Sequence, residues 1–122
     1  MSTFQVLLEI GDLQGTRFES QQAWVDTGAF YTQAPRSLLR RVGVVPSFRR
    51  TFLMANGRRV QRHVGEARVR LEDQSITTPI VFATEGSPVL LGAYTLEGFA
   101  LIPDPVNRRL VPMEALPLLS LF

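Results

Sequence analysis

The sequence predicts a small all-β domain, built as a closed barrel or sandwich with one or two short helices. Eight prolines and nine glycines divide the 122 residues into many short segments. Several segments alternate apolar and polar residues with the period of two that is typical of strands. Turn signals, such as the stretch from Gly11 to Gly15 and the pair Asn56-Gly57, separate them. Because neither a linker nor an internal repeat interrupts the chain, we expect a single domain over residues 1–122.

The first third of the chain predicts two strands and a short helix. Residues 3–10, TFQVLLEI, alternate apolar and polar side chains for most of their length, and residues 17–25 predict the returning strand. A short extended stretch follows. Pro35 then suits the first turn of a helix, PRSLLRRVG, and Gly43 suits its C-terminal end.

The middle of the chain predicts a long hairpin. Residues 48–54 are expected to be extended, Ala55-Asn56-Gly57 to turn, and residues 58–72 to return as a long strand. Gly65 interrupts that strand and predicts a bend or a bulge.

The last third predicts further short elements. They are a turn at 73–75, a strand at 76–83, the segment VLLG at 89–92, a helix at 93–99, and strands at 100–104 and 110–112 around a turn. The tail MEALPLLSLF, residues 113–122, is apolar, and we expect it to pack on the domain or on a partner.

Composition excludes several kinds of chemistry. The chain has no cysteine, which removes disulfides, thiolate nucleophiles and Cys-ligated zinc. His63 is the only histidine and cannot build a His-based metal centre, so we expect no metal and no cofactor, with His63 on the surface. No apolar run reaches the roughly 18 residues that span a bilayer, and the N-terminus lacks the pattern of a secretory signal. We therefore expect a cytoplasmic protein that has no membrane segment.

All thirteen basic residues are arginines, against eleven acids, for a formal charge of +2. Their pairs are scattered along the chain, which favours a solvated surface over nucleic-acid binding. A basic barrel that binds nucleic acid is nevertheless an alternative. Only Phe48 and Phe52, beside Arg49-Arg50, give the interleaved aromatic residues that such a surface uses.

A carboxylate stands at the end of a predicted core strand, where Ala23-Trp24-Val25 leads into Asp26-Thr27-Gly28. We expect Trp24 to lie in the core beside this loop. Asp-Thr-Gly is a good turn in its own right, because Asp bonds its own backbone and Gly tolerates positive φ. Its context is more informative. An alanine follows it, a predicted hairpin comes next, and VLLG at 89–92 then precedes a short helix.

This order of motifs resembles the retropepsin-like (clan AA) aspartic peptidases. The resemblance covers roughly residues 4–112, and small bacterial members are similar in further stretches: LMANGRRV, HVGEARVRL and VLLGAYTLEGFALIPDPVNRRLVP. It implies a retropepsin-like barrel or sandwich with one lobe per chain. It also implies an aspartic endopeptidase, which hydrolyses peptide bonds with a water that two carboxylates activate.

That mechanism needs two carboxylates, and the chain has one Asp-Thr-Gly. Asp12, Asp73 and Asp104 are followed by other residues and do not repeat the motif. The second carboxylate would come from Asp26 of another copy across a two-fold axis. We therefore expect a homodimer that acts on a peptide or protein substrate.

The resemblance assigns roles to matching positions. Asp26 is expected to be the catalytic acid and base, Thr27 to brace the two loops across the dimer, and Gly28 to let the substrate approach. The hairpin at 52–61 is expected to be a flap that closes over the substrate and excludes water. The remaining substrate-binding residues are expected to be Ala29, Phe30, Met54, Ala55, Asn56, Gly57, Leu90 and Leu91.

The chain departs from the viral pattern in the same region. Phe30 and Tyr31 stand where retropepsins usually carry acidic residues, and Ala93 stands where they usually carry arginine. Two alternatives to these expectations stay open. The hairpin at 52–61 would be an ordinary β-hairpin, or the whole chain would be a catalytically silent dimer that acts as a binding or assembly module.

Overall fold

The structure, a computed structural model, describes residues 3–114. Most of the predicted tail at 113–122 therefore lies outside the described residues. The elements are β1 (Gln5–Gly11), β2 (Phe18–Val25), β3 (Thr32–Pro35), α1 (Arg36–Val42), β4 (Pro46–Leu53), β5 (Arg59–Leu71), β6 (Gln74–Ala83), β7 (Leu90–Leu91), α2 (Ala93–Gly98), β8 (Leu101–Asp104) and β9 (Arg109–Pro112).

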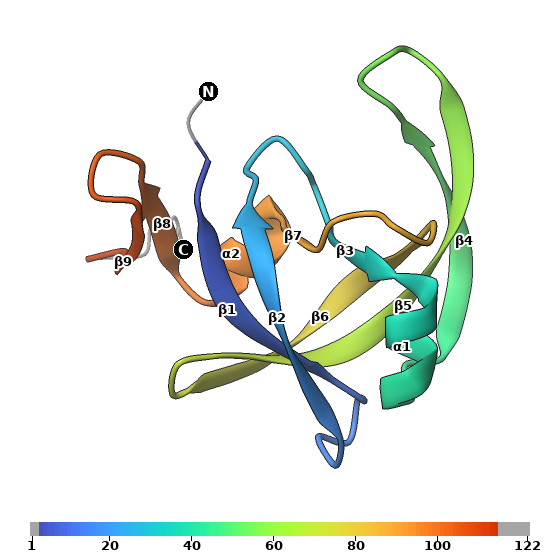
Figure 1. Cartoon of the computed structure of the whole chain (residues 1–122), viewed down its shortest axis with the longest axis horizontal. Coiled ribbons are helices and arrows are strands. Elements are labelled where there is room, and N and C mark those ends of the chain that lie inside the picture. The colour runs from blue at the N-terminus through green and yellow to red at the C-terminus, as the bar shows by residue number, and fades with distance from the viewer. Residues whose placement is uncertain (1–2, 115–122) are drawn as a thin grey trace, which may run out of the picture.

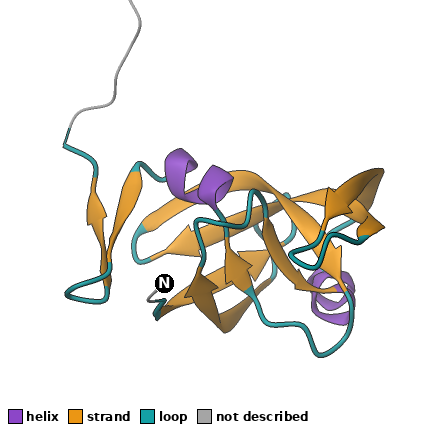
Figure 2. Ribbon diagram, turned by 90° about the horizontal axis from the view of Figure 1, so that it is seen from above, coloured by secondary structure: helices purple, strands orange, loops and turns teal. Residues whose placement is uncertain are grey.

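Six of these strands close into a barrel. The sheet runs in the order β1-β2-β7-β3-β6-β5-β4, and a further pairing of β1 with β5 completes the ring. β4 is left at the edge, paired only with β5, and the β4–β5 hairpin extends beyond the barrel (Figure 1). β8 and β9 form a separate two-stranded ribbon, which Figure 2 shows beside the barrel. The predicted all-β closed architecture with two short helices is confirmed.

The alternation of side chains along the strands fills this barrel. Leu8 and Ile10 of β1 are fully buried, and so are Val69 of β5 and Ile80 of β6. The alternation also corrects one prediction. Trp24 is 38% exposed, because the core-facing positions of β2 on either side of it are taken by Ala23 and Val25.

Local signals placed α1 well. Pro35 lies one residue before the helix with extended backbone angles, and Gly43 ends it in the left-handed conformation at φ 93°. The N–H of Gly43 donates to the carbonyls of Leu39 and Arg40, which satisfies groups that the last helical turn leaves free.

Two details of the β5 strand differ from prediction. Its turn into β6 is formed by Glu72 and Asp73 alone, because Gln74 already pairs with Leu71. The irregularity that Gly65 predicted falls on the partner strand β4. A Cβ on Gly65 would lie 2.5 Å from the carbonyl oxygen of Val45, so glycine is needed there for a close backbone approach.

Candidate active site

Asp26 leaves β2 at the point where that strand runs parallel to β7. Its backbone N–H donates to the carbonyl of Leu91 at 3.0 Å. Its Oδ1 accepts the N–H of Gly28 at 2.9 Å, and its carbonyl accepts the N–H of Ala29 at 3.1 Å. The tripeptide is thus a side-chain-capped turn, as its composition predicts. Within residues 3–114, the second carboxylate oxygen of the half-buried Asp26 makes no hydrogen bond.

The rest of this loop is fastened to the start of α2. The N–H of Ala93 donates to the carbonyl of Ala29 at 2.9 Å, and the N–H of Tyr94 donates to the carbonyl of Phe30 at 3.0 Å. Gly92 passes so close that a Cβ there would lie 2.6 Å from the carbonyl carbon and oxygen of Tyr31. Only glycine fits this contact without moving backbone.

Three buried threonines support the loop from behind. Thr95 Oγ1 lies 2.6 Å from Thr32 Oγ1 and 2.8 Å from Thr78 Oγ1. Thr32 Oγ1 also accepts the N–H of Gly92 at 3.0 Å. These hydroxyls join β3, β6 and α2 beneath the loop, and all three side chains are essentially inaccessible to solvent. Sequence reasoning missed this cluster, because its members are far apart in the chain and no local pattern marks them.

A groove of about 530 Å³ separates the Asp26 loop from the β4–β5 hairpin. Four of the predicted site residues line it: Gly28, Ala29, Phe30 and Met54. Asp26 and Thr27 immediately precede these in the loop, outside the lining itself. Leu90 and Leu91 form β7 behind the loop, with Leu91 fully buried.

The other predicted residues form the hairpin tip. The N–H of Gly57 donates to the carbonyl of Met54 at 2.9 Å, and Gly57 has the positive φ of 85° that its position requires. The Oδ1 of Asn56 accepts the N–H of Arg58 at 3.0 Å. Ala55, Asn56 and Gly57 are exposed and stand outside the groove lining.

An aromatic cluster bridges the two sides of the groove. Tyr31 lies 4.8 Å from Phe30 and 5.9 Å from Tyr94 between ring centroids, and its edge-to-face contact with Phe52 spans 6.1 Å. Phe52 belongs to β4, so Tyr31 links the Asp26 loop to the hairpin. Sequence reasoning noted Phe30 and Tyr31 as departures from a pattern but did not predict this contact.

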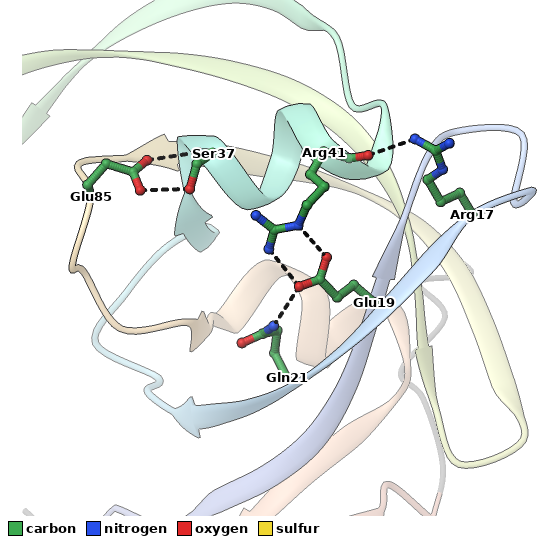
Figure 3. A network of polar contacts seen from close by, with 6 residues as sticks. All are labelled: Arg17, Glu19, Gln21, Ser37, Arg41 and Glu85. Atoms are coloured by element: carbon green, nitrogen blue, oxygen red, sulfur yellow. Dashed lines mark hydrogen bonds and ion pairs between the residues drawn. The ribbon is translucent and has the colours of Figure 1, made fainter.

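Two arginines, Arg50 and Arg62, are the charged side chains of the groove. The ion pairs of the described residues lie elsewhere. Figure 3 shows Arg41 of α1 bound through two nitrogens to Glu19 of β2, and Glu85 bound to Ser37.

These contacts lower the pKa values of the two carboxyl groups. The hydrogen bond from Arg41 holds the pKa of Glu19 below its usual value, and the Ser37 hydroxyl and N–H do the same for the pKa of Glu85.

In the described part of the chain, no cluster of three His, Asp or Glu side chains is arranged to hold a metal ion. None of the helices in residues 3–114 has the length and apolar character to cross a membrane.

The fold has solved relatives. No protein-family model and no curated protein matches the sequence. The protease of simian foamy virus (mac) matches with a TM-score of 0.55 and 18% identity, covering 78% of this chain and 93% of the protease. EIAV protease, solved with the inhibitor HBY-793, matches with a TM-score of 0.58 and 15% identity, covering 78% and 86%.

A third match is a bacterial protein, Lpg0085 of Legionella pneumophila, described as having unknown function. Its TM-score is 0.56 at 17% identity, and the match covers 84% of this chain and 92% of that protein. Two of these three structures are thus viral proteases, and each of the three is matched over 86% or more of its length. The chain therefore has the retropepsin fold, as a single lobe.

Proposed function

We propose that the protein is a homodimeric aspartic endopeptidase in which the Asp26 carboxylates of two copies face each other. The observation that carries this proposal is the setting of Asp26. One oxygen is held by the N–H of Gly28, the backbone is held by Leu91, and the other oxygen is left without a partner in residues 3–114. A carboxylate oriented in this way at the end of a rigid strand is suited to chemistry.

The chemistry follows from placing two such groups together. Two carboxylates about 3 Å apart share one proton, because both cannot carry a negative charge at that distance. The ionised member takes a proton from a water molecule as the water oxygen attacks the scissile carbonyl carbon. The protonated member donates to the carbonyl oxygen, so proton transfer to the amide nitrogen can then release the two products.

One lobe cannot supply this pair. The residues described as lining the groove include no Asp or Glu, and no second Asp-Thr-Gly occurs in the chain. Asp26 also stands outside the lining of the single chain's groove, as expected if the catalytic position lies at a two-fold axis. Thr27 is exposed in the same loop, and its hydroxyl has no hydrogen-bond partner within residues 3–114. We assign it the bracing contact with the partner's loop.

The substrate would lie extended along the groove. Gly28, Ala29 and Phe30 would contact it from the loop, and Met54 with the hairpin tip at 55–57 would cover it as a flap. Leu90 and Leu91 would support the loop from behind. Closure of the hairpin would exclude bulk water from the carboxylate pair.

The test is cleavage of a mixed peptide library between pH 4 and pH 7 by the wild type and by Asp26→Asn in parallel. The proposal expects cuts by the wild type that the variant does not make. Equal cleavage by both proteins would exclude Asp26 as the catalytic group. A dimer that cuts nothing across the library would favour the silent binding or assembly module.

A further inference from the structure

Two like charges face each other across the β4–β5 hairpin. Arg50 of β4 pairs directly with Arg62 of β5, and both side chains line the groove. The adjacent pair on the same face is Phe52 with Val60, which also lines the groove. Like charges directly opposite on neighbouring strands destabilise a sheet. The folded chain thus places two positively charged side chains opposite each other on one face of the hairpin.

No acid of the hairpin relieves this repulsion. The segment 46–65 contains five arginines and no Asp or Glu. Every ion pair in the described residues uses a different arginine: Arg36, Arg41, Arg70 or Arg109. Arg50 stacks over the ring of Phe48 at 4.9 Å, and Arg62 Nη1 donates to the carbonyl of Gln61 at 3.0 Å. Neither contact neutralises the charge.

Positive charge is concentrated in the hairpin segment, and the acidic residues lie in the rest of the chain. The hairpin segment carries five of the thirteen arginines, whereas the rest of the chain carries eight arginines against eleven acids and is negative. A concave surface lined by one sign of charge concentrates its field in the groove. The groove is therefore suited to an anionic group, and residues 3–114 place no Asp or Glu in its lining.

We propose that the Arg50–Arg62 pair binds an aspartate or glutamate side chain of the substrate, beside a large apolar residue that packs on Tyr31 and Phe52. The proposal deepens the endopeptidase function and rests on it. Guanidinium groups bind a carboxylate through paired N–H donors, and two of them can enclose a single carboxylate. Binding of the substrate carboxylate between Arg50 and Arg62 would replace their mutual repulsion with attraction to the carboxylate. It would therefore favour closure of the hairpin onto a peptide that carries an acidic side chain.

The surroundings favour an acidic peptide over a nucleic acid. Binding of single strands needs open aromatic faces on which bases stack. The Tyr31 ring is inclined to those of Phe30, Phe52 and Tyr94 by 57°, 75° and 59°, so these rings do not form a row of parallel faces for successive bases. One face of the Phe48 ring is occupied by Arg50, 4.9 Å from its centroid. The Asp26 loop on the opposite side would also repel a chain of phosphates, whereas a peptide brings only the one charge that the arginines need.

The experiment uses fluorescein-labelled octapeptides of alanine centred on Phe-Leu. A single Glu is moved through the six other positions and replaced at each by Gln or Lys. Binding to Asp26→Asn protein is followed by fluorescence anisotropy at 0.15 M salt, so that cleavage does not interfere. At one position or a symmetry-related pair, Glu should bind at least about fivefold tighter than Gln, with Lys weakest.

Variants locate the effect. Arg62→Gln and Arg50→Gln should each remove most of the preference for Glu. Arg49→Gln is the matched control, because Arg49 pairs with His63 on the other face of the hairpin and does not line the groove. It should keep the preference. Equal binding of Glu and Gln at every position, or the same loss in all three variants, would overturn the proposal.

Two further arms separate the possible failures. An eight-nucleotide oligothymidine that binds tighter than every Glu peptide, with a steep dependence on salt, would overturn the peptide assignment in favour of nucleic acid. Wild-type protein is also tested for cleavage of the same peptides. Preferential binding of Glu without any cleavage would refute the endopeptidase function while the carboxylate site stands. Cleavage without the preference for Glu would refute the carboxylate site alone.

Discussion

The Asp26 loop and the β4–β5 hairpin border one groove, yet they are held in opposite ways. The loop is tied by backbone hydrogen bonds to β7 and α2 and is backed by the buried Thr32 and Leu91. Seven of the eight residues of β4 are exposed, and the hairpin extends away from the barrel (Figure 1). Its aromatic contact with the loop is the one between Phe52 and Tyr31.

In the proposed endopeptidase, the difference separates two tasks. A segment with few buried contacts opens at low cost, whereas a loop that positions a reacting group must not move. Substitutions beneath the loop should therefore lower stability and activity together. Substitutions on the hairpin should alter activity while the fold keeps its stability.

The largest expected effect is on catalysis at Asp26 itself. Asp26→Asn should lower kcat/KM by about 1,000-fold or more, because the acid–base pair is lost. The amide oxygen of asparagine can still accept the N–H of Gly28, so the thermal midpoint should stay nearly constant. Peptide cleavage and differential scanning calorimetry measure the two quantities. A large drop in the midpoint would mean that the carboxylate is structural.

Gly92→Ala tests the rigidity of the loop. The added Cβ would meet the backbone of Tyr31 and Ala29, which cannot yield as a flexible side chain can. We expect a loss of about 2–3 kcal/mol in the free energy of unfolding, measured by urea denaturation. Gly86→Ala is the control, with open space around it and only its positive φ of 83° to strain the chain. Gly86→Ala should lower the free energy of unfolding by about 1 kcal/mol.

Thr95→Val tests the hydroxyl cluster. The substitution keeps the shape of the side chain but removes the partner of both Thr32 and Thr78. Leaving buried hydroxyls without their partner should lower the free energy of unfolding by about 1–2 kcal/mol. Urea denaturation measures this loss, and Thr95→Ser, which keeps the hydroxyl, should recover most of it. A neutral Thr95→Val would show that the cluster does not hold the loop.

Phe52→Ala tests the opposite region. It removes the contact with Tyr31 and should lower the free energy of unfolding by only about 0.5–1 kcal/mol, since Phe52 lies on a largely exposed strand. The value of kcat/KM should fall about tenfold, because the hairpin loses its position over the groove. Steady-state kinetics and urea denaturation of the same preparation compare the two effects. A loss of stability larger than that of Thr95→Val would contradict the contrast between the regions.

The smallest expected effect is the dependence of the thermal midpoint on acid pH, through the ion pair of Glu19 with Arg41. The pKa of Glu19 is held below its ordinary 4.5 by Arg41, so its contribution to stability is complete above that value. It is lost as pH falls through the lowered pKa of the folded state. The thermal midpoint should therefore be level from pH 7 to about pH 5 and decline below it. Glu19→Gln should make that decline shallower, and only slightly, because exposed ion pairs contribute little.

Local signals in the sequence predicted much of the fold. Pro35 and Gly43 predicted the two ends of α1, and Asn56-Gly57 predicted the turn of the β4–β5 hairpin. Segments that alternate apolar and polar residues predicted strands that the structure contains. The insertion of β7 between β2 and β3 has no local signal, because it depends on pairings between distant segments. Trp24 was predicted in the core as part of the apolar run Ala23-Trp24-Val25, but the alternation of the strand turns its side chain away from the core.

Sequence signals reach less far at the candidate site. A motif drew attention to Asp26-Thr27-Gly28, and the roles assigned to these residues remain predictions. The contacts that surround them could not be predicted. Arg50 and Arg62 become a pair only through the register of β4 against β5, and nothing in the scattered arginine pairs of the sequence indicates that register.

The central claim is that each active site uses Asp26 from two chains, and subunit mixing tests it most directly. Wild type and Asp26→Asn are combined in equal amounts, unfolded and refolded together, and assayed for cleavage of one peptide. If both carboxylates are needed, only dimers with two wild-type chains cut, and activity falls to about a quarter of that of unmixed wild type at the same total protein concentration. A residual activity of about one half, proportional to the wild-type share, would show that each chain works alone and would contradict the claim.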